Sequence, residues 1–196
     1  TLATSSAASD VYKRQGKNHK IKADKVLVTV GRKPNTQGWG LEKMAVDMDG
    51  PFVKVDKQCR TSMKNVWAIG DIIGEPMLAH KASAQAEMVS EIIAGHKREF
   101  DPVSIAAVCF TDPEIVGVGL TPNEAKEEGI ETIVGKFPFA ASGRALAMDA
   151  GKDGGFVRIT ARKDNQVIVG IHAVGSHVSE LSGEFALALE MGARLD

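Results

Sequence analysis

Two short apolar runs limit what this chain can fold into. Residues 25–30 (KVLVTV) and 66–69 (VWAI) contain several β-branched side chains, and each run stops at a glycine. Runs without polar alternation are typical of strands that are buried on both faces of a parallel sheet. A central strand needs a neighbour on each side, yet the sequence before residue 100 predicts only one other strand, at 52–55. We therefore expect the first half of the chain to be a piece of a larger α/β domain.

A helix is predicted between the second run and Gly95, because glycine commonly ends helices. Apolar residues recur there at intervals of three and four, which places them on one face. These residues are Ala79, Ala82, Ala86, Val89 and Ile93. The charged segment 96–102 (HKREFDP) follows and ends near a proline. We interpret this segment as a connection and place a domain boundary there.

Beyond residue 102 the sequence predicts short strands and two helices. Strands are expected at 105–110, 116–118, 132–137, 156–161 and 167–174. One helix begins at Thr121, where Thr-Pro-Asn-Glu combines an N-cap, a proline at the first position and a glutamate that reaches back to the cap. A second helix covers 177–191, and residues 163–165 (KDN) are typical of a hairpin turn. This order predicts an α+β module with a mostly antiparallel sheet and helices on one face.

The composition argues against several classes of partner. A net charge of -1 provides no general attraction to nucleic acid or anionic lipid. No apolar run approaches the roughly 18 residues of a membrane helix. The two cysteines, Cys59 and Cys109, lie in neither a CxxC nor a metal-ligand spacing. We expect free thiols in a reducing cytoplasm, with Cys109 in the core, and no metal site.

Both ends of the chain are unusual. Residues 1–15 are small and polar, lack the apolar centre of a secretory signal, and end in DVYKRQ, which looks like a translated sequencing adapter. We expect residues 1–15 to be non-native or disordered and exclude them from the fold. The last five residues follow the predicted final helix directly, so we expect the native chain to continue.

The strongest candidate for chemistry is the end of the second apolar run. Gly70 would let a ligand approach the backbone, and Asp71 would offer a carboxylate to a hydroxyl group. The helix that begins near residues 77–80 (MLAH) would direct its unpaired N–H groups towards negative charge. Each feature also has an ordinary explanation, namely a Gly-Asp turn with a solvated carboxylate and a common helix start.

Taken in order, these segments resemble the pyridine nucleotide-disulphide oxidoreductase family. The first three segments that carry the resemblance are ADKVLVTVGRKPN, RTSMKNVWAIGD and PMLAHKA. Those that resemble the family's interface domain are CFTDPEIVGVGLTPNEA, FPFAASGRALAM, GKDGGFVRI and IHAVGSHVSELSGEFALALEMGA. The resemblance implies the end of a Rossmann-like NAD domain at 16–33, part of an FAD domain at 34–100, and an interface domain at 101–196 that forms a homodimer and is truncated at its C-terminus.

The resemblance also implies roles for individual residues. Gly31 lies by NAD through its backbone, Asp71 accepts a hydrogen bond from a flavin ribityl hydroxyl, and the helix start lies along the flavin ring. The implied cofactor-binding residues are Gly31, Gly70, Asp71, Met77, Leu78, Ala79 and His80. We interpret His80 as structural rather than as a base. His172 and His177 are expected to be packing or interface residues, and Arg144 is given no chemistry.

The reaction that the resemblance implies needs parts that this sequence lacks. It contains no CxxxxC pair, no GxGxxG loop and no HxHPT-like motif, so no catalytic residue is assigned. The parent enzyme is expected to reoxidise dihydrolipoamide on the lipoyl-bearing acyltransferase of a 2-oxoacid dehydrogenase complex, passing electrons through a disulfide and FAD to NAD. The fragment itself is expected to be inactive. The alternatives are a stand-alone dimerisation module, or a glutathione reductase-like or mercuric reductase-like member of the family.

Overall fold

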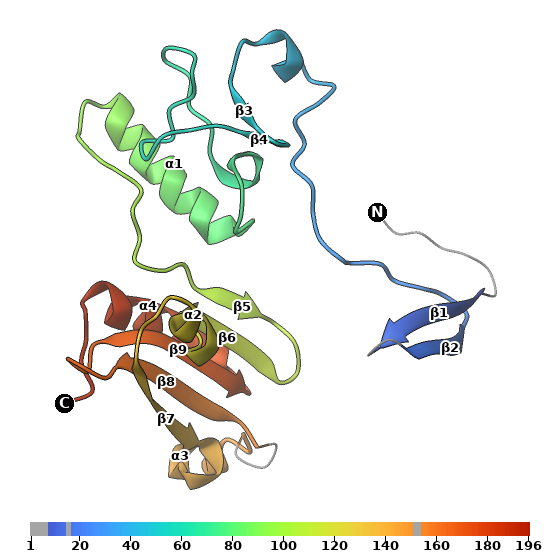
Figure 1. Cartoon of the computed structure of the whole chain (residues 1–196), viewed down its shortest axis with the longest axis vertical. Helices are drawn as coiled ribbons and strands as arrows, with labels where there is room; N and C mark the ends of the chain where they lie inside the picture. The colour runs from blue at the N-terminus through green and yellow to red at the C-terminus, as the bar shows by residue number, and fades with distance from the viewer. Residues whose placement is uncertain (1–7, 15–16, 151–153) are drawn as a thin grey trace.

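The chain begins with a hairpin in this computed structural model, which describes residues 8–14, 17–150 and 154–196. Strand β1 (Ala8–Arg14) pairs antiparallel with β2 (Lys17–Ala23). The hairpin stands apart from the rest of the molecule at the end of an extended segment (Figure 1). Part of the stretch that the sequence led us to exclude thus forms a strand, whereas residues 1–7 and 15 lie outside the described residues.

The first apolar run does not form the strand that we expected. Residues 25–30 have no regular structure, and Val30 is 94 % exposed. A strand forms only when a neighbour accepts and donates its backbone hydrogen bonds. Among the described residues no strand pairs with this run, and Leu27, Val28 and Val30 remain exposed. No parallel strand pair forms in the described part of the chain, and the Rossmann-like assignment therefore stays a proposal.

The middle of the chain is built around one helix. Short elements precede it, namely η1 (Leu41–Lys43), the paired strands β3 (Met48–Asp49) and β4 (Phe52–Val53), and η2 (Gly70–Ile73). Helix α1 (Ala79–Ile93) follows. The prediction of a strand at 66–69 is wrong, because only Trp67 makes a bridge, to Arg60. The prediction at 52–55 holds for its first two residues.

Helix α1 covers the predicted range, but of the five residues expected on its inner face only Val89 is fully buried. Its buried residues are Lys81, Gln85, Met88, Val89 and Ile92. Ile93, which we expected on the inner face, is 65 % exposed. Met88, Val89 and Ile92 form a core cluster with Cys59. The apolar periodicity was misleading because the first half of the inner face is polar.

The second half forms the antiparallel sheet that the sequence predicts (Figure 1). Its strands are β5 (Ala107–Cys109), β6 (Glu114–Gly119), β7 (Thr132–Pro138), β8 (Phe156–Arg162) and β9 (Ile168–Gly175). They lie in the order β5-β6-β9-β8-β7, and every pair is antiparallel. The hairpin between β8 and β9 turns at the predicted residues, 163–165.

Short helices complete this domain. They are α2 (Pro122–Glu127), η3 (Phe139–Ala141), α3 (Gly143–Ala147), η4 (Val178–Leu181) and α4 (Ser182–Glu190). Helix α2 has the full capping box that the sequence predicts at Thr121 and Glu124. Helix α3, which contains the exposed Arg144, was not predicted. No helix among the described residues is long and apolar enough to cross a membrane.

The expectation that all helices cover one face of the sheet is wrong. Phe185 and Leu189 of α4 pack on Val116 and Val118, on one face of β6. His172 belongs to the other face, because its neighbours in β9, Ile171 and Ala173, belong to the same core as α4. Glu124 of α2 lies close enough to His172 to affect its charge. Helices α2 and α4 therefore lie on opposite faces.

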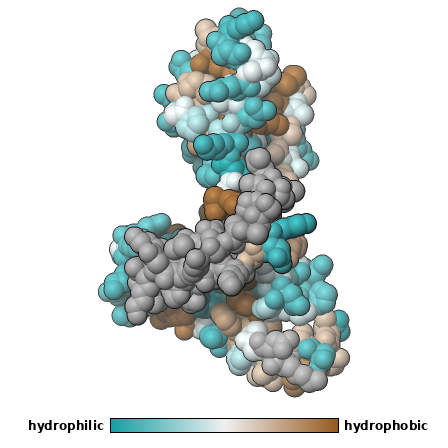
Figure 2. Space-filling model, turned by 90° about the vertical axis from the view of Figure 1, so that its right-hand side faces the viewer, coloured by the Kyte–Doolittle hydropathy of each residue, from teal (hydrophilic) through white to brown (hydrophobic). Residues whose placement is uncertain are grey.

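Cys109 is not in the core, contrary to our expectation. It lies on the edge strand β5 and is exposed, because its neighbour Val108 is the residue that points into the core. Other exposed large apolar residues of this domain are Val103, Phe110, Ile115, Ile133, Val134, Phe137, Leu146, Met148, Leu187, Met191 and Leu195. Figure 2 shows hydrophobic surface on both the upper and the lower part of the molecule.

The connection between α1 and the sheet is held by hydrogen bonds along its length. The Phe100 N–H donates to the Lys57 carbonyl at 2.8 Å, and the Val103 N–H donates to Glu190 Oε1 at 2.8 Å. His80 Nε2 lies 2.8 Å from the Ala106 carbonyl oxygen. Residues 96–102 thus form the expected connection, and this connection is anchored to both halves.

The Gly170→Ala variant should unfold at a markedly lower urea concentration, because the substitution destabilises the sheet domain. An added Cβ would lie 2.8 Å from the Leu120 carbonyl carbon and closer still to its oxygen, and both are backbone atoms that cannot step aside. We expect a loss of about 3 kcal/mol or more, measured by urea unfolding. Gly135→Ala is the matched control, because a Cβ there meets nothing within 4 Å. Equal stability of the two variants would contradict the close packing of Gly170 against Leu120.

Stability should fall in mild acid through His172. Burial lowers the pKa of this histidine, the nearby Arg158 adds to the effect, and Glu124 opposes it. Because the folded-state pKa lies below the unfolded-state value, the stability that comes from keeping His172 neutral is fully present above about pH 6.5. It is lost as the pH falls below that value. His172→Gln should therefore flatten the dependence of thermal unfolding on pH between about 7.5 and about 5.5. An unchanged slope, with the exposed His96→Gln as control, would refute this role.

Candidate functional site

The η2 turn presents Asp71 beside a buried glycine. Gly70 is buried with a φ of 76°, and its N–H donates to Gln85 Oε1 at 2.9 Å. A Cβ at Gly70 would lie 3.2 Å from the Ala82 Cβ, so the turn lies directly on α1. The Asp71 side chain, by contrast, is 45 % exposed. The turn thus fixes its backbone against the protein and leaves a carboxylate available to a ligand.

Arg32 brings three of the predicted segments together. Its Nη1 lies 3.8 Å from Asp71 Oδ2 and donates to the Met77 carbonyl oxygen at 2.9 Å. The residue that follows Gly31, the η2 turn and the entry to α1 therefore meet at one guanidinium. The ion pair is exposed and contributes little to stability. Sequence analysis did not identify Arg32, because its partners lie far along the chain.

The N-terminus of α1 is open. Its N-cap residue, Leu78, supplies no side-chain cap, and Ala79 and His80 are exposed. Within the described residues the N–H groups of Ala79, His80 and Lys81 have no hydrogen-bond acceptor. Such groups carry the positive end of the helix dipole and favour a negatively charged or hydrogen-bond-accepting ligand atom.

The other predicted site residues differ in what they offer. Met77 is buried, so its side chain packs inside the protein. Its backbone N–H donates to Glu75 Oε2 at 3.0 Å. His80 uses its ring to contact the Ala106 carbonyl, in keeping with a structural role. Gly31 is exposed, and a Cβ there would meet no atom within 4 Å. The structure therefore groups Asp71, Met77 and the helix start, and Gly31 is an exposed residue next to Arg32, which joins them.

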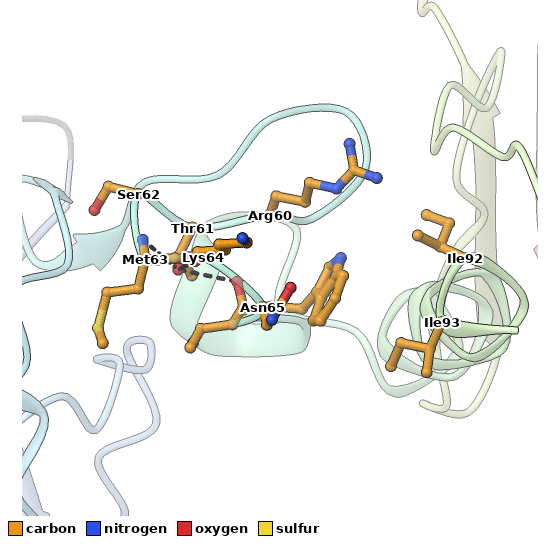
Figure 3. Close-up of a pocket in the computed structure, with 10 residues that line it drawn as sticks. Arg60, Thr61, Ser62, Met63, Lys64, Asn65, Ile92 and Ile93 are labelled. Atoms are coloured by element: carbon orange, nitrogen blue, oxygen red, sulfur yellow. Dashed lines mark hydrogen bonds between the residues drawn. The ribbon is translucent and has the colours of Figure 1, made fainter. Parts of the chain in front are cut away.

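A pocket of about 740 Å³ lies elsewhere, between the loop at residues 60–67 and the end of α1. Figure 3 shows Ile92 and Ile93 of the helix on one side of this pocket, with Arg60 and Asn65 on the other. None of the predicted cofactor residues lines it. Its lining offers cationic, hydroxyl and amide groups but neither a carboxylate nor a thiol. This pocket is therefore not the site that the sequence predicts.

Neither cysteine is suited to redox chemistry with the other. Both are free thiols, with Cys59 buried and Cys109 exposed. Burial raises the pKa of the Cys59 thiol, and Asp56 adds to the shift, so the reactive thiolate is disfavoured. No three His, Cys, Asp or Glu side chains are grouped as metal ligands in the part of the chain that the structure describes.

Two sequence profiles match most of the chain. Residues 3–86 match the pyridine nucleotide-disulphide oxidoreductase profile. Residues 105–196 match the dimerisation domain of the same group of enzymes.

Individual relatives agree with these profiles. A dihydrolipoyl dehydrogenase of Pseudomonas aeruginosa is 61 % identical over 181 residues, which is 92 % of this chain and 39 % of that protein. One of Geobacillus stearothermophilus is 47 % identical over 182 residues, again 92 % of this chain and 38 % of that protein. This chain therefore spans about two fifths of the length of the curated relatives that it matches.

Solved structures support the fold. The crystal structure of LpdA from Mycobacterium tuberculosis superposes with a TM-score of 0.78 at 28 % identity, covering 89 % of this chain and 38 % of that one. The HOCl-induced flavoprotein disulfide reductase RclA from Escherichia coli superposes with a TM-score of 0.81 at 23 % identity, covering 96 % and 45 % of the two chains. The second likeness concerns the fold alone.

Proposed function

The chain belongs to the pyridine nucleotide-disulphide oxidoreductase family, and from that premise we propose that it is part of a dihydrolipoyl dehydrogenase that binds FAD through Asp71 and the start of helix α1. The observation that carries this proposal is the meeting of an exposed carboxylate and an uncapped helix N-terminus. Arg32 contacts the carboxylate of Asp71 directly and the Met77 carbonyl just before the helix. The identity of 61 % to a dihydrolipoyl dehydrogenase over 92 % of the chain supports the choice within the family.

The residues that are present fit a flavin. A ribityl chain carries hydroxyl donors, and Asp71 offers an accessible acceptor with the opposite hydrogen-bonding character. The flavin gains negative charge at its pyrimidine edge on reduction, and the unpaired N–H groups at Ala79 and His80 would stabilise charge placed there. Gly70 would support the site through its place in the turn, because the absence of a side chain lets the turn lie directly on α1. When bound, FAD supplies electron transfer between a disulfide and NAD.

Other site residues then act without touching the reaction directly. Met77 supports the entry to the helix by packing, since its side chain is buried. Leu78 and Ala79 contribute backbone, and His80 holds the helix start against residue 106. We assign Gly31 to the edge of the NAD site, where its exposed backbone can contact the nicotinamide nucleotide. This chain alone should be inactive, because its sequence lacks the redox cysteine pair and the acid/base histidine motif.

We propose the same organisation for the parent enzyme as the sequence suggested. Residues 16–33 would end the NAD domain, residues 34–100 would belong to the FAD domain, and residues 101–196 would pair with a second copy to form a homodimer. The dimerisation profile over 105–196 and the exposed apolar residues of that domain support the last assignment. The electron donor would be dihydrolipoamide on an acyltransferase of a cytoplasmic 2-oxoacid dehydrogenase complex.

Asp71→Ala in the full-length enzyme should weaken FAD binding. The carboxylate accepts a charge-assisted hydrogen bond worth roughly 1.5–3 kcal/mol, which corresponds to a rise of about 10- to 150-fold in the FAD dissociation constant. Fluorescence titration of the apoenzyme with FAD would measure this dissociation constant. Asp49→Ala, at an exposed acid of the same part of the chain, is the control. Unchanged FAD affinity in Asp71→Ala would remove the basis of the proposed site.

The full-length enzyme should sediment as a dimer whose contact lies within residues 102–196. Hydrogen exchange measured above and below the dimer dissociation concentration should change mainly in peptides from this range, because burial in an interface shields backbone amides. A monomer at all concentrations would contradict this assignment. So would protection that maps to residues 34–100.

A further inference from the structure

Two buried polar side chains of helix α1 hold the two ends of the turn that carries Asp71. Gln85 Oε1 accepts the N–H of Gly70, where η2 begins, at 2.9 Å. Lys81 Nζ donates to the carbonyl of Gly74, where η2 ends, at 2.6 Å. The two side chains are 3 % and 5 % exposed. Because they are four residues apart, they project from the same face of the helix.

Burying these two polar side chains is unfavourable in free energy, and packing alone does not explain it. Lysine and glutamine are rarely fully buried, and each costs free energy unless it is hydrogen-bonded. The following two turns of the same face use Met88, Val89 and Ile92, which pack with Cys59 at no such cost. Apolar residues at positions 81 and 85 would leave the Gly70 N–H and the Gly74 carbonyl without these partners. The polar pair therefore serves the turn rather than the core.

The η2 turn needs an external hold. It is only four residues long, and glycines stand at both ends, with φ of 76° at Gly70 and 120° at Gly74. Glycine restricts the backbone least, so such ends do not fix the direction of a short turn by themselves. The backbone of Gly70 also lies close to α1, since an added Cβ there would be 3.2 Å from the Ala82 Cβ.

We propose that Lys81 and Gln85 are positioning residues that fix the Asp71 carboxylate relative to the first turn of α1. The proposal rests on the function proposed above, in which these two features bind one flavin. The helix that supplies the open N–H groups also carries the two side chains that hold the turn. Both halves of the flavin site thus keep a constant spacing, so that one cofactor can meet them together.

The first test compares FAD affinity and the visible circular dichroism of the flavin in variants of the full-length enzyme. Gln85→Leu and Lys81→Met keep the size of the side chains but remove the hydrogen bonds, and each should raise the FAD dissociation constant about tenfold and alter the dichroism. Gln85→Glu keeps an acceptor and Lys81→Arg keeps a donor, so both should restore most of the affinity. Glu87→Gln, on the exposed face of α1, is the control. Affinity and dichroism unchanged in Gln85→Leu and Lys81→Met would overturn the proposal.

A double-mutant cycle separates positioning from general stabilisation. If Gln85 acts through Asp71, the double variant Asp71→Ala/Gln85→Leu should lose less affinity than the sum of the single losses. Additive losses would mean that Gln85 is merely structural and would overturn the proposal. An Asp71→Ala variant with normal affinity would instead defeat the proposed function, so the two failures are distinguishable.

A measurement on the unaltered holoenzyme decides the question even if an apolar variant fails to fold. The Gly70 amide should exchange with solvent as slowly as amides in the middle of α1, because Gln85 holds it to that helix. Exchange at the rate of an exposed turn would show that the turn is not held and would overturn the proposal.

Discussion

The buried face of helix α1 is the constraint on which the middle of the chain depends. Among the described residues between 24 and 106, no other regular element is longer than four residues. The loops around α1 take their positions from it, through an apolar cluster at its C-terminal half and through Lys81 and Gln85 at its N-terminal half. The candidate site is consequently set by one helix and the turns attached to it, rather than by a continuous sheet.

The second half of the fold was largely predictable because its signals are local. The capping box at Thr121 and the hairpin turn at residues 163–165 each lie within a few consecutive residues, and both form as expected. Which face of a strand or helix is buried depends on contacts with segments far along the chain. Cys109 is exposed because β5 is an edge strand whose inward position falls on Val108. Helix α3 was missed because five residues are too few for a periodic pattern.

The first half of the chain was poorly predictable because its structure depends on pairing between segments. An apolar run records only that burial is favourable, whereas a strand is a property of a pair of segments. Residues 25–30 have no strand paired with them among the described residues, and residues 66–69 make a single bridge. The candidate site follows the same rule. Asp71 was predictable from its place after an apolar run, but Arg32, Lys81 and Gln85 were not, since their roles arise from backbone partners that folding brings near.

The anchored connection has a mechanical consequence. His80 belongs to the first turn of α1, and its imidazole contacts the carbonyl of Ala106, directly before β5. Val103 is tied in turn to Glu190 at the end of α4. A swing of the sheet domain as a rigid body must stretch these short bonds before it can leave α1 behind. Any such movement would therefore have to break the hydrogen bond at the tip of the helix, beside the candidate site.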